Sequence, residues 1–297
     1  MIRLGLCCIF KNQPIRFRRT TARYMKGFTR KGQIDRLSDI CLENARSLSK
    51  ALRFCDENSI GSFRVNSQIL PLMTHPEVGY DIDDLPLSDA IKSHFRTCGE
   101  FASTRDIRLT FHPDQFVLLS SKTLSVTRNS IAELEYQAQI AEWINADVIN
   151  IHGGGMYGNK KDALVRLEKE ILKLSEPVRS RLTLENDDRI YTPSDLLPVC
   201  LKTRTPLVYD VHHHRVNPDD LAVCDVTPLV LKTWNREPLF HISSSKNGRN
   251  RNDQRKHHDF IEPGDFPECW RNLDITLEVE AKAKEEAVLK FKKDIGI

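Results

Sequence analysis

The chain has 297 residues, of which 40% are hydrophobic and 29% are charged, with a formal net charge of +3. This length suits one large α/β domain over residues 1–297, and the composition is that of an ordinary soluble protein. No stretch approaches the ~20 consecutive apolar residues of a membrane span, and the N-terminus lacks a signal-peptide cleavage site. The eight cysteines are scattered without a CxxC pair. We therefore expect a cytoplasmic protein with reduced thiols, several of them buried.

Short β-rich stretches alternate with helical patterns along the chain. Strands are predicted at 2–8, 61–67, 108–113, 147–152, 181–187, 206–214, 238–245 and 273–282. Helices are predicted at 33–58, 88–103, 125–145, 160–174 and 218–234, after Thr192-Pro193, and in the C-terminal tail. Residues 69–87 are rich in Pro and Asp and are expected to form a long ordered loop. This order predicts a TIM (β/α)8 barrel. The alternative, an open doubly wound sheet, lacks a GxGxxG after the first strand.

Potential metal ligands stand at the ends of successive predicted strands. They are His112, His152, Glu185, Asp210 with His213, His241 and Glu280. The carboxyl ends of barrel strands meet at one rim, which is where such enzymes carry their active sites. Histidine and carboxylate without cysteine suit Zn²⁺, Mn²⁺ or Fe²⁺. The sequence therefore predicts one metal site at the C-terminal rim of the strands.

Within this set, Glu185 is expected to bridge two ions, with one oxygen to each, as in enzymes that cleave phosphodiesters. His112 and His152 would serve one ion, whereas Asp210, His241 and Glu280 would serve the other. The predicted catalytic residues are Glu185, His112, His152, Asp210 and Glu280. His213 and His258 could hold a third ion. Two of these residues could instead have a purely structural function: Asp210 could cap the following helix, and Glu280 could pair with Lys282 or Lys284.

Two further histidine groups and one glycine run bear on the site. On an extended strand, His213 would point opposite to His212 and His214, so only one face of the triplet would reach the metals. His94 and His257 are expected to be ordinary surface residues. Gly153–Gly154–Gly155 allow a tight turn with close backbone approach to a ligand.

Positive charge gathers in two segments that follow predicted strands and would therefore lie on the same rim. The first, 11–31, contains Lys and Arg but no acidic residue, and the second spans 246–258. Clustered cations beside a metal site indicate a polyanion, such as a phosphate backbone. Lys246 and Arg64 are candidate DNA contacts, and His75 in the Thr-His-Pro loop is a candidate phosphate contact.

With these features placed, the chain resembles the UV damage endonuclease family. The resemblance rests on FHPDQF (111–116), NIHGGGMYG (150–158), LENDDR (184–189), YDVHHH (209–214), HISSSK (241–246) and VEAKAKE (279–285). It implies a TIM barrel related to endonuclease IV, with a cluster of divalent ions, typically two or three Mn²⁺, although Zn²⁺ or Mg²⁺ would also serve. The implied reaction is incision of damaged double-stranded DNA on the 5′ side of cyclobutane dimers and 6-4 photoproducts. No obligate protein partner is implied, and a monomer is expected.

The resemblance also assigns residues. The ligands of the family fall on His112, His152, Glu185, Asp210, His213, His241, His258 and Glu280. Its lesion-probing Gln–Tyr pair falls on Gln115 and Phe116, which keeps an aromatic wedge but loses a hydroxyl. A modified lysine that takes part in the metal cluster of some members is replaced by Leu239. A tyrosine of the first strand is replaced by Leu6, and Asn12 is the nearest candidate for the polar contact that follows it.

Three other functions remain open at this stage. An abasic-site endonuclease of the endonuclease IV type would need a pocket for one flipped sugar. A metal-dependent sugar isomerase would need a closed, acidic site, which the basic rim segments oppose. A catalytically inactive binder of damaged DNA has only Leu239 in its favour.

Overall fold

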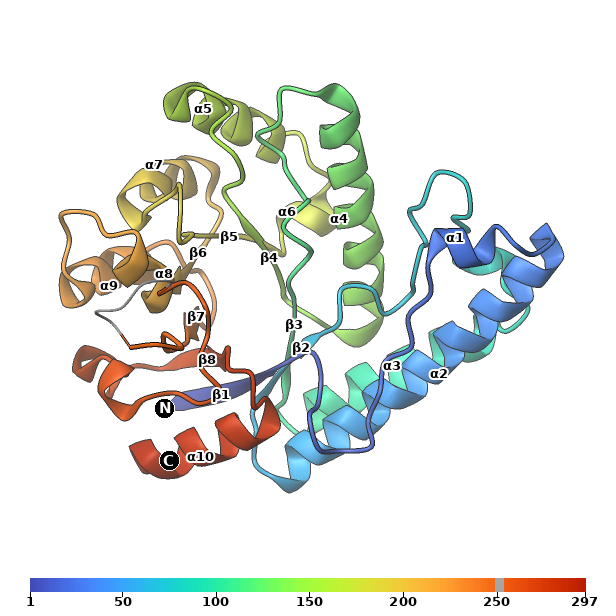
Figure 1. Ribbon diagram of the computed structural model, residues 1–297, viewed down its shortest axis with the longest axis horizontal. Helices are drawn as coiled ribbons and strands as arrows, with labels where there is room; N and C mark the ends of the chain where they lie inside the picture. Colours follow the sequence, from blue (N-terminus) through green and yellow to red (C-terminus); the bar gives the residue numbers. More distant parts are fainter. Residues whose placement is uncertain (249–253) are drawn as a thin grey trace.

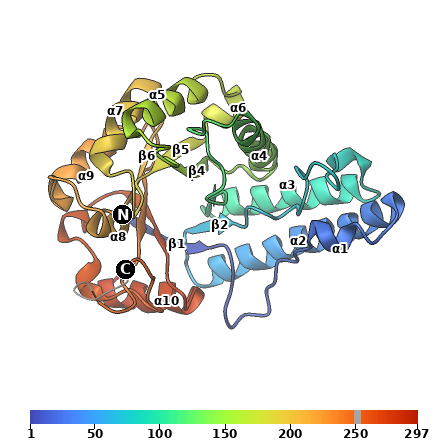
Figure 2. The same cartoon turned by 45° about the horizontal axis from the view of Figure 1, so that its top comes forward.

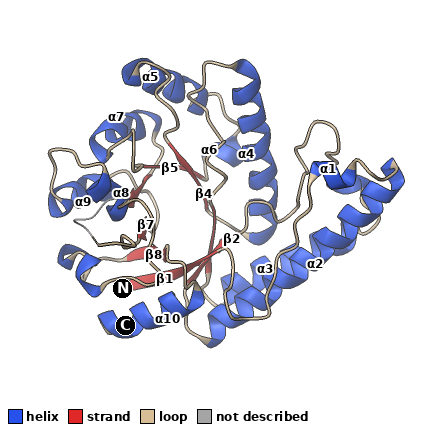
Figure 3. Cartoon of the chain, in the orientation of Figure 1, coloured by secondary structure: helices blue, strands red, loops and turns tan. Residues whose placement is uncertain are grey.

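The structure is a computed structural model that describes residues 1–248 and 254–297. Parallel strands form a closed barrel in chain order from β1 to β8, surrounded by helices (Figures 1 and 3). This arrangement confirms the predicted TIM barrel. The strands are β1 (Ile2–Cys7), β2 (Ser62–Val65), β3 (Arg108–Phe111), β4 (Val148–His152), β5 (Leu182–Glu185), β6 (Leu207–Asp210), β7 (Leu239–Ile242) and β8 (Ile275–Val279).

The helices follow the predicted order with shifted ends. They are α1 (Ala22–Met25), α2 (Arg30–Glu57), α3 (Ser88–Thr104), α4 (Leu124–Ile144), α5 (Lys160–Ile171), α6 (Glu176–Arg179), α7 (Pro193–Thr203), α8 (Val211–Val216), α9 (Val223–Leu231) and α10 (Glu285–Ile295). Short 3-10 turns are η1 (Ile82–Asp84), η2 (Pro263–Asp265) and η3 (Glu268–Trp270). None of the described helices is long and apolar enough to cross a lipid bilayer.

Helix α2 is much longer than the barrel strands. Its 28 residues span ~42 Å at 1.5 Å per residue, whereas β1, with 6 residues, spans roughly 20 Å. Helices α2 and α3 pack side by side and project beyond the barrel, with α1 at the far end (Figure 2). Barrel helices run opposite to the strands, so the start of α2 lies on the side of the C-terminal rim. We call α1, α2 and α3 the arm.

Side chains alternate between the helical layer and the barrel interior along each strand. A small apolar cluster of Val148, Val208 and Leu239 is separate from the main core. It fills the interior below His241, which stands two residues beyond Leu239 on the same face of β7. Polar side chains occupy the interior above this cluster, so the site stands on an apolar floor.

Local sequence signals predicted some helix ends correctly, but they missed the change from strand to helix after β6. Thr192 caps α7, and its side chain accepts a hydrogen bond from the N–H of Asp195, as the Thr-Pro pair predicted. The predicted strand at 206–214 is wrong in its second half, because β6 ends at Asp210 and α8 follows at once. The expectation of reduced thiols throughout is also wrong for one pair, since Cys224 of α9 and Cys269 of η3 form a disulfide.

Candidate metal centre

The C-terminal ends of six neighbouring strands deliver the predicted ligands to the barrel mouth. His152, Glu185 and Asp210 are the last residues of β4, β5 and β6. His112 and Glu280 directly follow β3 and β8, and His241 is the next-to-last residue of β7. Adjacent strands are paired in register here, for example His152 with Glu185 and Asp210 with His241. The alternation of side chains along parallel strands therefore points all of them into one space.

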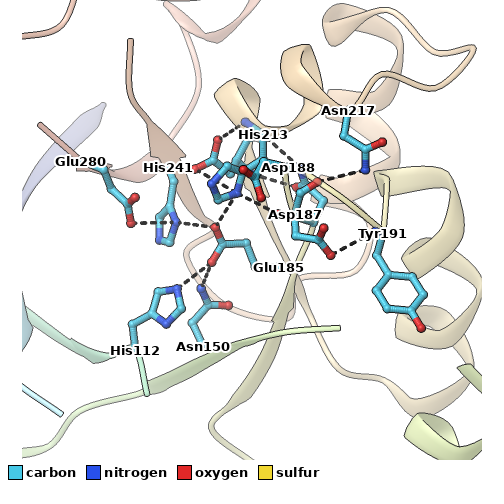
Figure 4. Close-up of polar contacts among 12 residues, drawn as sticks. His112, Asn150, Glu185, Asp187, Asp188, Tyr191, His213, Asn217, His241 and Glu280 are labelled. Atoms are coloured by element: carbon cyan, nitrogen blue, oxygen red, sulfur yellow. Dashed lines mark hydrogen bonds and ion pairs between the residues drawn. The ribbon is translucent and has the colours of Figure 1, made fainter. Parts of the chain in front are cut away.

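Glu185 lies at the centre of this space and is fully buried. Its Oε2 accepts a hydrogen bond from Asn150 Nδ2 at 2.5 Å and lies 2.9 Å from His112 Nε2 (Figure 4). Its Oε1 lies 3.1 Å from His241 Nδ1 and 3.3 Å from His213 Nδ1. The two oxygens thus face different histidines, which is the arrangement that a bridging carboxylate requires.

Ligand atoms gather in three overlapping groups, in each of which they lie within 4.8 Å of one another. The groups are His112–His152–Glu185, His112–His241–Glu280 and Glu185–Asp210–His213. They contain every predicted ligand except His258. Because His112 and Glu185 each belong to two groups, the arrangement resembles a shared multi-ion centre more than separate single sites.

Asp210 has two functions in this geometry. One oxygen, Oδ1, accepts a hydrogen bond from the N–H of His213 at 2.7 Å and so caps α8. The helical turn then places the His213 ring beside Asp210, at 3.6 Å between Nδ1 and Oδ2. The helix-cap alternative and the ligand prediction for Asp210 are therefore compatible, since each uses a different oxygen.

Two buried ligand atoms have no hydrogen-bond partner among the described residues. They are Nδ1 of His152 and Oδ2 of Asp210. Leaving a polar atom buried and unpaired costs on the order of 1–3 kcal/mol, so such atoms call for a bound partner. Imidazole nitrogen and carboxylate oxygen are donors that Mn²⁺, Zn²⁺ and Fe²⁺ accept. The residues present thus fit divalent ions.

The electrostatics of the centre follow from burial and from mutual contact. Burial alone would raise the pKa of the Glu185 carboxyl, but the imidazoles of His241 and His152 hold it well below its usual range. Burial opposes charge on His241, yet Glu185 raises the pKa of His241 to about 10. At His152 burial outweighs the attraction of Glu185 and lowers the pKa. A neutral His152 has one ring nitrogen with the free lone pair that ligation requires.

The structure does not bring His258 to the centre, and its neighbour His257 stands there instead. His258 Nδ1 accepts a hydrogen bond from the N–H of Phe260 at 3.1 Å. His257 Nδ1 lies 3.8 Å from Glu280, and its ring contacts those of His212 and His213. The physical reason is local: His257 pairs with Ser245 in an isolated bridge, and adjacent extended residues point in opposite directions. The expectation of His257 as an ordinary surface residue is therefore wrong.

The other histidines of the triplet have structural partners. His214 lies 2.7 Å from the Tyr209 hydroxyl and 2.9 Å from Asp219. His212 packs against His257. Only His213 reaches the ligand groups, as expected, but a helical turn causes this and not an extended strand. The glycine run forms the predicted turn, with Gly154 at φ +88°, and a Cβ there would lie 2.7 Å from Ser120 Oγ. The close approach at Gly154 is therefore to Ser120 of the same chain.

The predicted DNA-contact residues fall into different environments. Gln115 and Phe116 are exposed on the loop after β3, where 71% of Phe116 is accessible. Lys246 is exposed, and His75 is half-buried with its Nδ1 accepting from the N–H of Glu77. Asn12 is exposed, but its amide contacts Glu286. Arg64, by contrast, lies inside the barrel against Glu278 and Glu280, so its assignment as a DNA contact is wrong.

Three further predictions concern replaced or basic positions. Leu6 is fully buried in the main core and pairs with Phe63 and Val279 along the strands, so it does not face the barrel mouth. Leu239 belongs to the apolar floor. Of the basic segment 246–258, the part at 249–253, with Arg249 and Arg251, lies outside the described residues. Arg255 pairs with Asp188.

Comparison with known proteins identifies the family. Residues 2–296 match the family model described as UV-endonuclease UvdE. The chain belongs to the UV-endonuclease UvdE family. A UV DNA damage endonuclease of Bacillus cereus (strain Q1) is 34% identical over 267 residues, which cover 86% of this chain and 82% of that relative. Another, of Bacillus velezensis, is 32% identical over 289 residues, covering 93% and 88%. This UvdE family member is therefore an enzyme, and the resemblance seen in its motifs is confirmed.

Solved structures agree with the fold. The crystal structure of SacUVDE aligns with 100% of this UvdE family chain and 98% of its own, with a TM-score of 0.88 at 24% identity. Endonuclease IV from Thermus thermophilus covers 84% of this chain and 94% of its own, with a TM-score of 0.60 at 16% identity. D-psicose 3-epimerase from Clostridium cellulolyticum shares the barrel at a TM-score of 0.57 and 12% identity. These likenesses support the barrel architecture.

Proposed function

We propose that this protein is a metal-dependent DNA-repair endonuclease that incises damaged double-stranded DNA on the 5′ side of UV photoproducts. The observation that carries the proposal is the position of Glu185 between two groups of histidines, with one oxygen toward each. Family membership supplies the reaction class, and the curated relatives are named UV DNA damage endonucleases. Mn²⁺ is the proposed ion, as the resemblance to the family implies, and the donor set of imidazoles and carboxylates is compatible with it.

The residues of the centre have distinct tasks in this proposal. His112, His152 and Glu185 would hold one ion, as expected from the sequence. The other expected set is divided differently in the structure: His112, His241 and Glu280 would hold a second ion, and Glu185, Asp210 and His213 a third. When bound, such ions stabilise charge on phosphoryl oxygens and supply an activated water. Asn150 holds Glu185 in place through its 2.5 Å hydrogen bond. Burial of Glu185, Asp210 and His241 keeps bulk water from competing for these groups.

Recognition of damage would fall to the loop after β3. The side chain of Phe116 is 71% exposed on this loop. Stacking of a base on an exposed aromatic ring is favourable. Phe116 also borders a cavity of about 500 Å³, which His75 and Tyr136 help to line. Phe116 and Gln115 would occupy the space of displaced bases at the lesion, and the cavity offers room beside them.

The arm and the segment just before it supply cations for the DNA backbone. Within the described part of the chain, Arg19, Arg23 and Lys31 are exposed and form no ion pair, whereas Arg18 pairs with Glu43 and Lys26 with Glu77. Unpaired cations that project beyond the rim are free to displace counterions from phosphates. DNA would therefore lie across the barrel mouth and along the arm.

Family membership weighs against the sugar isomerase and inactive-binder alternatives. An inactive binder would not need every ligand group that gathers around Glu185. The abasic-site alternative differs in substrate and not in chemistry, so only the choice of DNA separates it from the proposal.

The test is incision of end-labelled duplexes that carry one cyclobutane dimer, one abasic site or no damage, with Mn²⁺ and with chelator. We expect a metal-dependent cut 5′ of the dimer that is lost in Glu185→Ala. Glu237→Gln is the matched control, because Glu237 lies at the opposite end of the barrel and hydrogen-bonds Arg3. Cutting of the abasic duplex alone would replace the proposal with the endonuclease IV-like function, and cutting of neither would refute both.

A further inference from the structure

A charged pair lies inside the barrel, directly beneath the candidate metal centre, and the proposed function does not use it. Arg64 of β2 and Glu278 of β8 point into the barrel interior, where their side chains are 10% and 1% exposed. Placing a guanidinium and a carboxylate in the interior costs desolvation energy that is regained only with good geometry and further hydrogen bonds. The contacts of Arg64 and Glu278 therefore indicate which neighbouring side chains they position.

Arg64 contacts two of the candidate ligands as well as its partner. Its Nε donates to Glu278 Oε2 at 2.5 Å, and its Nη1 lies 2.6 Å from Glu280 Oε1. Its Nη2 lies 2.9 Å from His241 Nε2. A guanidinium is planar and its donors are fixed relative to one another. One side chain thus fixes the relative positions of Glu278, Glu280 and His241.

Glu278 faces the side of His241 that points away from the centre. His241 Nδ1 lies 3.1 Å from Glu185 and 3.5 Å from Glu280, whereas Nε2 lies 3.2 Å from Glu278 Oε2. A histidine that offers its Nδ1 lone pair to a cation carries its proton on Nε2. Without an ion, Nε2 can accept a hydrogen bond from Arg64 Nη2. Once Nε2 carries the proton, Arg64 cannot be its partner, because a guanidinium only donates, but Glu278 can accept this hydrogen bond. Carboxylates commonly fix metal-bound histidines in this way.

The surroundings of Glu278 hold it in place. Its Oε2 accepts a hydrogen bond from Arg64 Nε at 2.5 Å. Thr110 donates a hydrogen bond to its other oxygen. Gly5 of β1, which pairs with Glu278, leaves the needed space, since a Cβ there would lie 2.9 Å from Glu278 Cγ. Side chains from β2, β3 and β7, together with the space that Gly5 of β1 leaves, thus favour one orientation of this carboxylate.

We propose that Arg64 and Glu278 are positioning residues, which set His241 with Nδ1 toward the ions and hold Glu280 before any ion binds. The inference rests on the proposed metal-dependent function. It assigns the preorganisation of the metal site to Arg64 and Glu278, which themselves ligate no ion. It also gives Arg64 a task inside the barrel in place of the DNA contact expected from its charge.

The test measures binding of Mn²⁺ alone by calorimetry, with thermal unfolding in chelator as the measure of folding. Glu278→Gln keeps the size of the side chain, and we expect it to weaken Mn²⁺ binding roughly 10–100-fold. The double variant Arg64→Met/Glu278→Met removes both charges, and apolar replacement of a buried pair is often neutral for stability. We expect it to fold, to show the same loss of affinity, and to change the visible spectrum of bound Co²⁺, which reports on histidine ligation.

Asp147→Asn is the matched control, because Asp147 pairs with Arg108 at 2.8 Å at the opposite end of the barrel. It should bind Mn²⁺ within twofold of the wild type. A folded Glu278→Gln or double variant that binds Mn²⁺ within twofold of the wild type would overturn the positioning role and leave the proposed function intact. A wild type that binds no Mn²⁺ would overturn both.

Discussion

Replacing Asn150 by alanine should weaken the metal centre without removing any of its ligands. Asn150 is buried, donates to Glu185 Oε2 at 2.5 Å, and accepts from the Thr183 hydroxyl at 2.9 Å. A hydrogen bond to a charged group contributes about 1.5–3 kcal/mol. If that energy holds Glu185 in its ligating orientation, its loss corresponds to a roughly 10- to 150-fold fall in Mn²⁺ affinity, since each ~1.4 kcal/mol is a factor of ten.

The assay is calorimetric titration with Mn²⁺, together with thermal unfolding in chelator. Asn44→Ala is the control, because Asn44 is equally buried and forms hydrogen bonds with Arg18 and Ile69, far from the centre. Both variants should lose comparable stability, but only Asn150→Ala should lose affinity. An Asn150→Ala protein that binds Mn²⁺ as tightly as the wild type would refute the reasoning that this hydrogen bond orients Glu185.

Three further predictions concern DNA recognition and the far end of the barrel. Phe116→Ala should weaken binding to a dimer-containing duplex by about 1–3 kcal/mol, the usual contribution of base stacking, and an equal loss on undamaged duplex would argue against a lesion-specific role. Arg23→Ala and Lys31→Ala should each reduce the slope of log affinity against log salt by ~0.9, whereas unchanged slopes would place the DNA away from the arm. At Glu237, burial would raise the pKa, but Arg3 lowers it below its ordinary value of 4.5. This contribution to stability is therefore present above pH 4.5 and lost as the pH falls below it, so Glu237→Gln should flatten the acid side of a plot of melting temperature against pH, and an unaltered plot would contradict this.

The barrel and most of the centre could be predicted because both depend on local patterns that recur. The strands are short and largely apolar, and β4, β5 and β6 end at polar residues, so the positions of His152, Glu185 and Asp210 at strand ends were visible in the sequence. Closure of the barrel then brings these ends together, whatever the details of the helices. For Glu280 nearby lysines offered a local alternative, but within the described residues it forms an ion pair with Arg64 and not with Lys282 or Lys284.

The remaining differences depend on a helix cap and on contacts between distant parts of the chain, which periodicity does not reveal. Strand β6 ends at Asp210 because its carboxylate caps α8, and an apolar run followed by three histidines does not reveal that turn. Cys224 and Cys269 are 45 residues apart, and only the packing of α9 against η3 brings them together. The sequence could not show which of the adjacent residues His257 and His258 faces the centre, because the bridge between His257 and Ser245 decides this.

The charge balance of the barrel mouth connects the stability of the fold to ion binding. Glu185, Asp210 and Glu278 are buried there and Glu280 is half-buried. Within the described residues Arg64 is the permanent cation that contacts Glu278 and Glu280. The remaining negative charge can be balanced by protonated histidines or by divalent ions. An ion that binds only the folded state stabilises it by RT ln(1 + [ion]/Kd), which is about 2.7 kcal/mol at 100 times Kd. The melting temperature should therefore rise with Mn²⁺ concentration and fall with chelator, and Glu185→Ala should abolish the rise. An equal rise in Glu185→Ala would mean that the stabilising ion binds elsewhere on the protein.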